Sequence, residues 1–311
     1  MTTLIAGIAL SIFAILMIGV GVYGNFRTRT VNNFLLGGRK IGSWISAFSY
    51  GTAYFSAVVF VGYAGMHGWN IGLASLWIGV GNALIGCYMA WKLLAVRTRQ
   101  MTHNLEARTM PEFFSARYNS RGMKLFAATL IFIFLVPYAA SVYKGLGMLF
   151  SAVFPGTPDW LCMALVAVLT AVCLTLGGYV SSTMTDFIQG FIMIVGVVIM
   201  VVAFAVRPEA GGFTSIVQKL REVDPELVNP TGGKSFRFLL FNILLTSVGT
   251  WGLPQMVHKF YAIRDEQSIR KATIVSTVFC AVIGCGAYFV GSLSRLFLAA
   301  TETGAPAIAG S

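Results

Sequence analysis

The residues in this sequence that are best suited to chemistry interrupt long apolar runs. In LTSVGTWGLPQMVHKF, residues 245–260, two glycines, a threonine, a tryptophan, a proline and a glutamine occur within seven residues. Pro254 lacks an amide hydrogen, and Gly249 and Gly252 weaken the same turn, so the pattern predicts a broken helix. The freed backbone groups can line a binding site, or the break can be a proline kink that serves helix packing.

A second interruption occurs in SWISAFSYGTAYFSAVVFVGYAG, residues 43–65, where glycine and hydroxyl-bearing side chains gather at the centre. Broken helices at corresponding positions of two halves of a chain point to the binding site of a transporter. Freed carbonyl groups can coordinate a cation, and half-helix ends can hold a charged solute. The solute-binding candidates beside this break are Ser49, Tyr54 and Ser56. Simple hydrogen bonding between helices is the alternative for each.

The first break has its own candidates, and a neighbouring helix adds more. The polar and aromatic side chains that flank it are Ser247, Thr250, Trp251 and Gln255. Trp251 is either a wall or gate of a cavity or an ordinary packing residue. After Pro137, a third set recurs at helical spacing on one face: Tyr138, Ser141 and Lys144. If Lys144 faces a solute cavity, it would suit a carboxylate-bearing solute. Alternatively, its side chain extends so that the ammonium lies among the outer lipid headgroups.

Asp186 is the acidic side chain that we place at a span boundary on the inner side. Acidic residues within membrane segments usually serve function. The alternative is that this carboxylate only favours the positive N-terminus of the helix that follows it.

The sequence has no pattern typical of an enzyme or of a structural metal site. The five cysteines lie in apolar runs without a CxxC pair, and the three histidines lack ligand spacing. No Gly-rich phosphate loop, nucleophile elbow or HExxH motif occurs. We therefore predict neither catalysis nor a cofactor.

Composition identifies the elements that must position these residues. Hydrophobic residues make up 57% of the 311-residue chain and charged residues 11%, and the mean hydropathy is +0.77. Runs of roughly 20 apolar residues mark membrane-spanning helices. Eight spans are predicted, at 3–24, 43–66, 72–96, 124–153, 159–178, 186–206, 236–259 and 272–299. The expected fold class is an all-α membrane protein.

The distribution of charge predicts the orientation of these spans. Basic residues gather in the segments 25–42, 92–124 and 259–271, whereas the alternate segments 67–71 and 154–158 contain no Lys or Arg. The positive-inside rule therefore places the N-terminus outside and these three segments in the cytoplasm. The net charge of +11 is split among short loops, which argues against nucleic acid as a partner.

Several stretches together resemble the sodium:solute symporter family. NNFLLGGRKIGSWISAFSYGTAYFSAVVFVGYAG (32–65) is similar to the family's FxxGGR entry and broken first core helix. TMPEFFSARYN (109–119) resembles its cytoplasmic TxPEFxxxRY loop. LGGYVSSTMTDFIQGFIMIVG (176–196) resembles its GG…TDxIQ segment, and GTWGLPQMVHKFYAIRD (249–265) its broken sixth core helix. Together these stretches span residues 32–271, most of the chain.

The resemblance implies a leucine-transporter-like inverted-repeat fold with one additional N-terminal helix. The organisation expected from it is an extra transmembrane helix at 1–24, a five-helix repeat at 43–206, the first two helices of a second repeat at 236–299, and an extracellular tail at 300–311. Members of the family usually continue for several more spans. The resemblance therefore predicts a truncated or partial carrier with an incomplete second repeat.

The resemblance also implies a function and an ion site. The expected function is sodium-coupled symport of a small organic solute by alternating access, in the inner (plasma) membrane, without a cofactor. Sodium would be bound by the backbone carbonyls of Thr52 and Phe55, and Asp186 would attract the cation on the inner route. Ser247 and Cys280 stand near positions where sugar carriers have an amide and a lysine, so an amino acid or small carboxylate is favoured. The alternatives are a transporter-like membrane sensor module and a non-transporting half-carrier.

Overall fold

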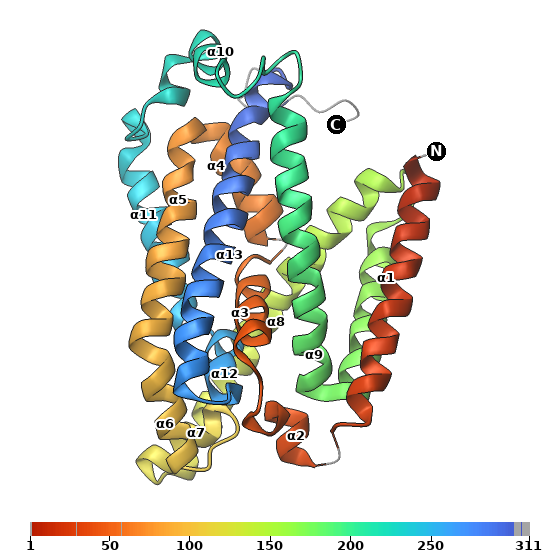
Figure 1. Cartoon of the computed structure of the whole chain (residues 1–311), viewed down its shortest axis with the longest axis vertical. Helices are drawn as coiled ribbons and strands as arrows, with labels where there is room; N and C mark the ends of the chain where they lie inside the picture. The colour runs from red at the N-terminus through yellow and green to blue at the C-terminus, as the bar shows by residue number, and fades with distance from the viewer. Residues whose placement is uncertain (1, 29, 57, 302–305, 307–311) are drawn as a thin grey trace. The chain divides into compact units, whose positions relative to one another are not determined.

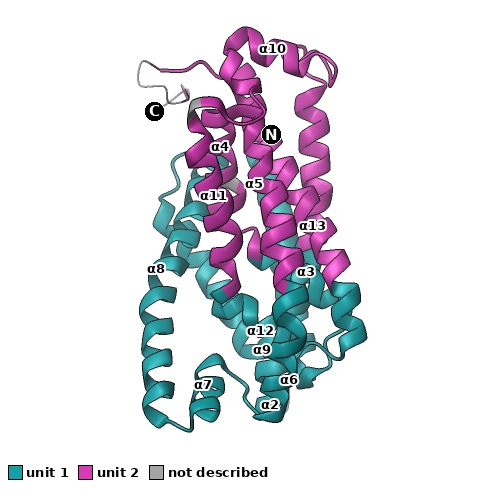
Figure 2. Ribbon diagram, turned by 90° about the vertical axis from the view of Figure 1, so that its left-hand side faces the viewer, with its two compact units in different colours: residues 1–53, 91–189, 252–272 teal, residues 54–90, 190–251, 273–311 magenta. Residues whose placement is uncertain are grey.

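The protein is all-helical in the part that the structure describes. The computed structural model describes residues 2–28, 30–56, 58–301 and 306, so most of the predicted tail at 300–311 lies outside the described residues. The only extended pairings within those residues are two isolated bridges, between Ile41 and Ile263 and between Ala300 and Pro306. The chain divides into two compact units, each assembled from three separate segments (Figure 2).

The first unit comprises residues 1–53, 91–189 and 252–272. Its helices are α1 (Thr2–Asn25), α2 (Val31–Leu36), most of α3 (Ser43–Tyr54), α6 (Val96–Asn104), α7 (Met110–Tyr118), α8 (Arg121–Val153), the first part of α9 (Asp159–Ala205) and α12 (Pro254–Ala262). Leu36, Ile41, Val257 and Tyr261 form the centre of a buried cluster in this unit. This cluster packs the short helix α2 and the start of α3 against the half-helix α12.

The second unit comprises residues 54–90, 190–251 and 273–311. Its helices are α4 (Ala64–Ile71), α5 (Leu76–Gly81), π-helical turns at Val58–Tyr63 and Asn82–Met89, the end of α9, α10 (Ile216–Val223), α11 (Phe236–Val248) and most of α13 (Glu266–Leu293). One buried cluster centres on Ile78, Leu239 and Tyr288. A second centres on Leu220, Leu227 and Leu293 and anchors the long connection between α9 and α11.

Two single glycines reverse the chain between successive helices. Gly72, after α4, has φ 68° and ψ −143°, and Gly178, inside α9, has φ 53° and ψ −145°. This backbone region is open essentially only to glycine. A Cβ atom at Gly72 would lie 2.2 Å from the carbonyl oxygen of Leu227, and one at Gly178 would lie 2.7 Å from that of Phe34. The chain therefore turns at each glycine without a loop, as Figure 1 shows at the lower end of α9.

Both predicted helix breaks are present. α11 ends at Val248, Gly249–Gly252 form a 3₁₀ turn, and α12 restarts at Pro254 at an angle of 52°. Pro254 occupies the first turn of α12, where a missing amide hydrogen costs nothing. α3 ends at Tyr54, and helical structure resumes at Val58.

Side-chain caps define the short elements between the spans. The TxPE motif is the start of α7, where the Thr109 hydroxyl accepts a hydrogen bond from the Glu112 amide at 3.4 Å. The Glu112 carboxylate in turn accepts from the Arg108 amide at 3.0 Å, much as in a capping box. Before α13, the backbone amide of Ser268 and the guanidinium of Arg264 donate to Asp265 and hold the pKa of that carboxyl low, at about 2.

Large apolar side chains point outward from the long helices, as in an integral multi-pass membrane protein. Ile15 on α1, Phe132 on α8 and Leu165 on α9 are 71%, 72% and 65% exposed. Such surfaces are stable in hydrocarbon and unfavourable in water. Among the described residues, five helices are long and apolar enough to cross a membrane, or six if the bent pair α11–α12 is one span.

The difference from the eight predicted spans lies in how helices are joined. Val58–Asn104 and Asp159–Ala205 each run for 47 residues and each cover more than one predicted span. At 1.5 Å per residue such a helix would be roughly 70 Å long, about twice the bilayer core, so the glycine reversals divide each into two. The helix that contains the predicted sixth span begins directly after Gly178, eight residues before the predicted start of the span at 186.

Candidate functional site

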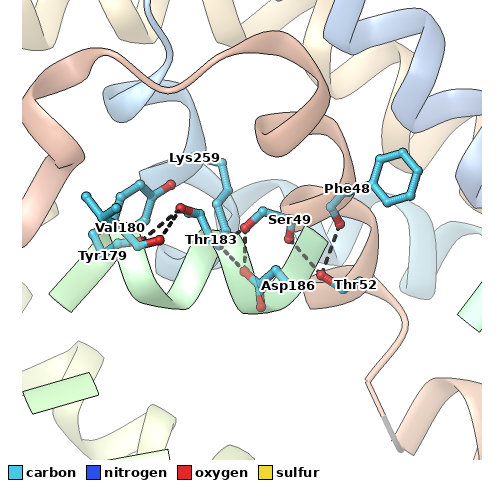
Figure 3. Close-up of polar contacts among 8 residues, drawn as sticks. All are labelled: Phe48, Ser49, Thr52, Tyr179, Val180, Thr183, Asp186 and Lys259. Atoms are coloured by element: carbon cyan, nitrogen blue, oxygen red, sulfur yellow. Dashed lines mark hydrogen bonds and ion pairs between the residues drawn. The ribbon is translucent and has the colours of Figure 1, made fainter. Parts of the chain in front are cut away.

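The first unit brings three polar side chains from three helices into one cluster. Lys259 of α12 donates from Nζ to Asp186 Oδ2 on α9 at 3.1 Å and to Ser49 Oγ on α3 at 2.5 Å. The Ser49 hydroxyl donates its own hydrogen to Asp186 Oδ2. The three side chains are thus joined pairwise by hydrogen bonds, as Figure 3 shows. We call these residues the Ser49–Asp186–Lys259 cluster.

The cluster is a charged pair taken out of water. Ser49 is fully buried, and the side chains of Lys259 and Asp186 are only 7% and 21% exposed. Charged groups at such positions persist only when they are paired and hydrogen-bonded. The Tyr179 ring lies beneath the ammonium, with its centroid 5.3 Å from Nζ, within range of a cation–π contact.

Two of our interpretations of these charges are corrected here. Asp186 is in the interior of a helix that resumes at Gly178, so it cannot serve the helix N-terminus. Lys259 was counted in a cytoplasmic basic segment, but it is buried within the molecule. No pattern in the sequence predicts that these two residues, 73 positions apart, would pair.

Thr52 and Phe55 lie where α3 ends. Thr52 is in the last turn of α3, whose final carbonyls have no partner within the helix, and Phe55 follows the helix directly. The Thr52 hydroxyl is used locally, because it donates to the carbonyls of Phe48 and Ser49 at 3.0 and 3.3 Å. Backbone oxygens, and not this hydroxyl, are thus what the segment can offer a cation.

The second unit gathers another set of predicted residues around a buried amide. Asn82 Oδ1 accepts hydrogen bonds from Thr246 Oγ1 at 2.8 Å and from Ser247 Oγ at 3.2 Å. The Tyr54 hydroxyl donates to the carbonyl of Thr246 at 2.7 Å. Tyr54 and Ser247 therefore belong to one buried polar network that connects Tyr54 and Asn82 to α11. Asn82 and Thr246 are not among the residues predicted from the sequence.

The remaining residues of the second unit make local contacts. Thr250 donates to the carbonyl of Ser247 at 2.9 Å, and Trp251 Nε1 donates to the carbonyl of Ile85 at 3.1 Å. Trp251 is thus fixed at the break by its own polar atom. The carbonyl of Ser56 accepts from the amide of Phe60 at 2.8 Å, which begins the helical segment after the break that follows α3.

A cavity of about 250 Å³ in the first unit lies beside the start of α12. Tyr138 lines it together with Gly252, Leu253, Pro254 and apolar side chains of α8. A second cavity, of about 190 Å³, shares Met110, Ile131 and Pro254 with the first and extends to His258 and Tyr261. Ser141 and Lys144 are exposed on α8 and do not line either cavity.

Gln255 has the least satisfied side chain near the break. Its amide nitrogen and oxygen are both buried, and neither has a hydrogen-bond partner among the described residues. A buried amide without partners costs free energy unless a ligand or water completes it. This residue is therefore well suited to contact a bound molecule.

The oxygen groups of these clusters suit a hard monovalent cation better than a transition metal. Within the described part of the chain, no three His, Cys, Asp or Glu side chains are placed to share a metal ion. Carboxylate, hydroxyl and carbonyl oxygens are the ligands of hard cations.

Sequence reasoning missed Lys259, Asn82 and Thr246. A signal was present for two of them, because Asn82 interrupts the apolar run IGVGNALIG and Lys259 falls at the edge of a predicted span. Polar residues in membrane segments are expected to have partners. The sequence does not show which residues those partners are.

Comparisons with known proteins agree with this architecture. The sodium:solute symporter family model matches residues 34–310. The chain is 30% identical over 288 residues to the osmoregulated proline transporter OpuE of Bacillus subtilis (strain 168), covering 91% of this chain and 57% of that protein. It is 28% identical over 297 residues to a sodium/proline symporter of Staphylococcus aureus (strain JH9), covering 94% and 57%. The chain thus spans little more than half the length of these relatives.

A solved structure shares the fold. A Na⁺-coupled sialic acid symporter in a substrate-bound, outward-open state matches with a TM-score of 0.71 and 18% sequence identity, over 92% of this chain and 63% of that one. At this identity the likeness concerns the fold alone. With a family model matched over residues 34–310, the conclusion is direct: the chain belongs to the sodium:solute symporter family.

Proposed function

We propose that the protein takes part in sodium-coupled symport of a small amino acid, with proline as the first candidate. The observation that carries the proposal is the buried Ser49–Asp186–Lys259 cluster, which joins both broken helices to α9 in a member of this family. The relatives named above are proline transporters, which favours proline over a sugar. Alternating access would then be movement of the broken half-helices around the bound solute.

The ion site of this proposal uses oxygen groups at the end of α3 and on α9. We assign the coupling sodium ion to the backbone carbonyls of Thr52 and Phe55 and, on the inner route, to the Asp186 carboxylate. The placement of Thr52 in the last turn of α3 supports this assignment, since its carbonyl has no helical partner.

The solute site uses the break between α11 and α12. A cavity of about 250 Å³ is smaller than the usual range for drug-sized ligands, which suits a small solute. Its apolar lining suits an aliphatic ring, while the backbone of Gly252–Pro254 and the unpartnered amide of Gln255 supply polar contacts. The other proposed solute residues are Ser49, Tyr54, Ser56, Tyr138, Ser141, Lys144, Ser247, Thr250 and Trp251.

Uptake into proteoliposomes tests the function. Proteoliposomes that contain the full-length protein should accumulate labelled proline about tenfold faster under an inward sodium gradient than under an inward potassium gradient. Glucose and sialic acid serve as control solutes and should not be accumulated. Binding of proline without uptake would indicate a sensor, and proline uptake that ignores sodium would overturn the coupling.

We also propose that the N-terminus faces outside in the inner membrane. The support is the excess of Lys and Arg in the segments 25–42, 92–124 and 259–271, with Lys259 now removed from that count. Single cysteines at the exposed positions Glu222 and Asn104 test it. A membrane-impermeant thiol reagent should label position 222 in intact cells and position 104 only after permeabilisation. The reverse pattern would invert the topology.

A further inference from the structure

The Ser49–Asp186–Lys259 cluster has the oxygen ligands of a cation-binding site, and the Lys259 ammonium is the cation that they hold. A carboxylate oxygen and a hydroxyl oxygen converge on the Lys259 ammonium at 3.1 and 2.5 Å. A hard metal cation would be held by the same two kinds of oxygen. The ammonium therefore occupies the position that an ion bound to Asp186 would need.

We propose that Lys259 is a tethered cation that competes with sodium for Asp186. In the absence of sodium, its ammonium neutralises the carboxylate, and sodium binds there by displacing it. This inference rests on the proposed function, because it assumes that Asp186 lies on the sodium route. It assigns to Lys259 the role of setting how much sodium the protein needs.

Charge balance requires the two cations to exclude each other. Asp186 carries one negative charge in a largely buried site, so one cation leaves the site neutral and two leave it positive. Like charges a few ångströms apart in a medium of low polarity repel strongly, and an unpaired buried charge is costly. The charge of Asp186 is therefore balanced either by the Lys259 ammonium or by a sodium ion. Both cations together would leave excess positive charge, and without either the carboxylate would be unpaired.

The Tyr179 ring adjoins the ammonium in its paired position and can keep contact with it as it leaves the carboxylate. Nζ already lies 5.3 Å from the centroid of the Tyr179 ring, on the same helix as Asp186. The four-carbon stem of lysine is flexible, and an aromatic face stabilises a cation that has lost its carboxylate. A rotation of the side chain, without movement of the backbone, can thus open the site.

The position of Lys259 connects the ion to the solute segment. Ser49 lies on α3, Asp186 on α9 and Lys259 on α12, so the cluster ties the two broken helices to α9. Gln255 precedes Lys259 by four residues and therefore lies on the same face of α12. When sodium replaces the ammonium, α12 loses its ionic attachment to α9. Sodium binding would in this way free the half-helix that carries the unpartnered amide.

The test measures sodium-dependent stability of the purified protein and its variants. Thermal unfolding midpoints are recorded in detergent across a sodium chloride series, with choline chloride keeping the ionic strength constant. Lys259→Gln should be less stable than wild type without sodium and should be stabilised at a half-saturating sodium concentration about tenfold lower. The reason is that a site blocked by lysine for nine tenths of the time binds with about tenfold weaker apparent affinity.

Matched variants separate competition from a purely structural ion pair. Lys259→Arg should raise the half-saturating sodium concentration, because guanidinium binds a carboxylate through two parallel hydrogen bonds. The double variant Asp186→Asn/Lys259→Gln should lose the sodium response. Lys271→Gln, which removes an exposed charge at the start of α13, should behave like wild type.

The outcomes distinguish this inference from the proposed function. A wild-type protein that responds to sodium, with an unchanged half-saturating concentration in Lys259→Gln, would overturn the competition and leave symport standing. No response to sodium in either protein, together with uptake that ignores sodium, would overturn both. If Lys259→Gln folds only when sodium is present, competition is supported. If it folds in neither salt, Lys259→Arg decides by whether its sodium requirement rises.

Discussion

Replacing Gly72 by alanine should prevent the second unit from folding stably. A side chain in this backbone conformation costs about 1–3 kcal/mol. The new Cβ would also lie 2.2 Å from the carbonyl oxygen and 2.5 Å from the Cα of Leu227, which are backbone atoms that cannot rotate away. Leu227 is 2% exposed within a buried cluster, and dislodging it adds roughly 2–5 kcal/mol. We expect the thermal midpoint in detergent to fall sharply and the yield of monodisperse protein to collapse.

Gly212→Ala is the matched control for Gly72→Ala. Gly212 also has a positive φ, of 84°, but a Cβ there would meet nothing within 4 Å. This control places a side chain at a positive φ without the collision. Equal midpoints for the two variants would mean that the contact with Leu227 has no energetic consequence. Gly178→Ala, whose Cβ would approach Phe34 at 2.6 Å, should resemble Gly72→Ala.

Replacing Gly249 by leucine should abolish solute transport while leaving the fold intact. A Cβ at Gly249 would have no atom within 4 Å, so a side chain can begin there without a collision at its first carbon. Leucine also favours helix over glycine by about 1 kcal/mol. The side chain would cover the backbone of the 3₁₀ turn and extend α11 into the break. Sodium-driven proline uptake should therefore fall by about tenfold or more, with an unfolding midpoint at or above that of wild type.

Gly196→Leu is the control for Gly249→Leu. Gly196 is exposed on α9, is equally free of neighbours within 4 Å and is remote from any break. This variant should transport like wild type. Normal uptake by Gly249→Leu, or a loss of stability without a loss of proline binding, would show that the break serves packing.

The helix breaks could be predicted from the sequence because their causes are local. Pro254 cannot continue a helix from the turn before it but fits the first turn of a new one, and Gly249 and Gly252 lower the cost of leaving helical geometry. The 52° bend lies at these residues. The motif TxPE likewise predicts its own cap, since Thr109 and Glu112 need only their neighbours to form it.

The positions at which one helix turns into the next could not be predicted from local sequence signals. Residues 179–185, YVSSTMT, are rich in hydroxyl side chains and look like a polar loop, so the predicted sixth span starts at 186, although the helix begins directly after Gly178. The error moved Asp186 from a helix interior to a helix end. A hydropathy pattern reports burial in lipid, and it does not report the backbone angle of a single residue.

The partners within the candidate sites depend on tertiary packing. Lys259 and Asp186 come from different helices, and no periodicity in either segment relates them. The positive-inside rule counts Lys259 among the cytoplasmic residues, because the sequence does not distinguish a buried lysine from a lysine in an exposed loop. The network at Asn82 was missed for the same reason, since its donors Thr246 and Ser247 lie more than 160 residues away. The roles of the site residues and the repeat boundaries stay predictions.

The two single-glycine reversals also affect how the chain is synthesised and how its gene can change. A helix that turns back on one residue offers no hydrophilic segment to be passed across the bilayer after the first half has entered. The halves on either side of Gly72, and those on either side of Gly178, must therefore enter the membrane as joined pairs. A descendant gene can lose either glycine only together with an insertion that lengthens the turn, because no other residue adopts this conformation at such close approach.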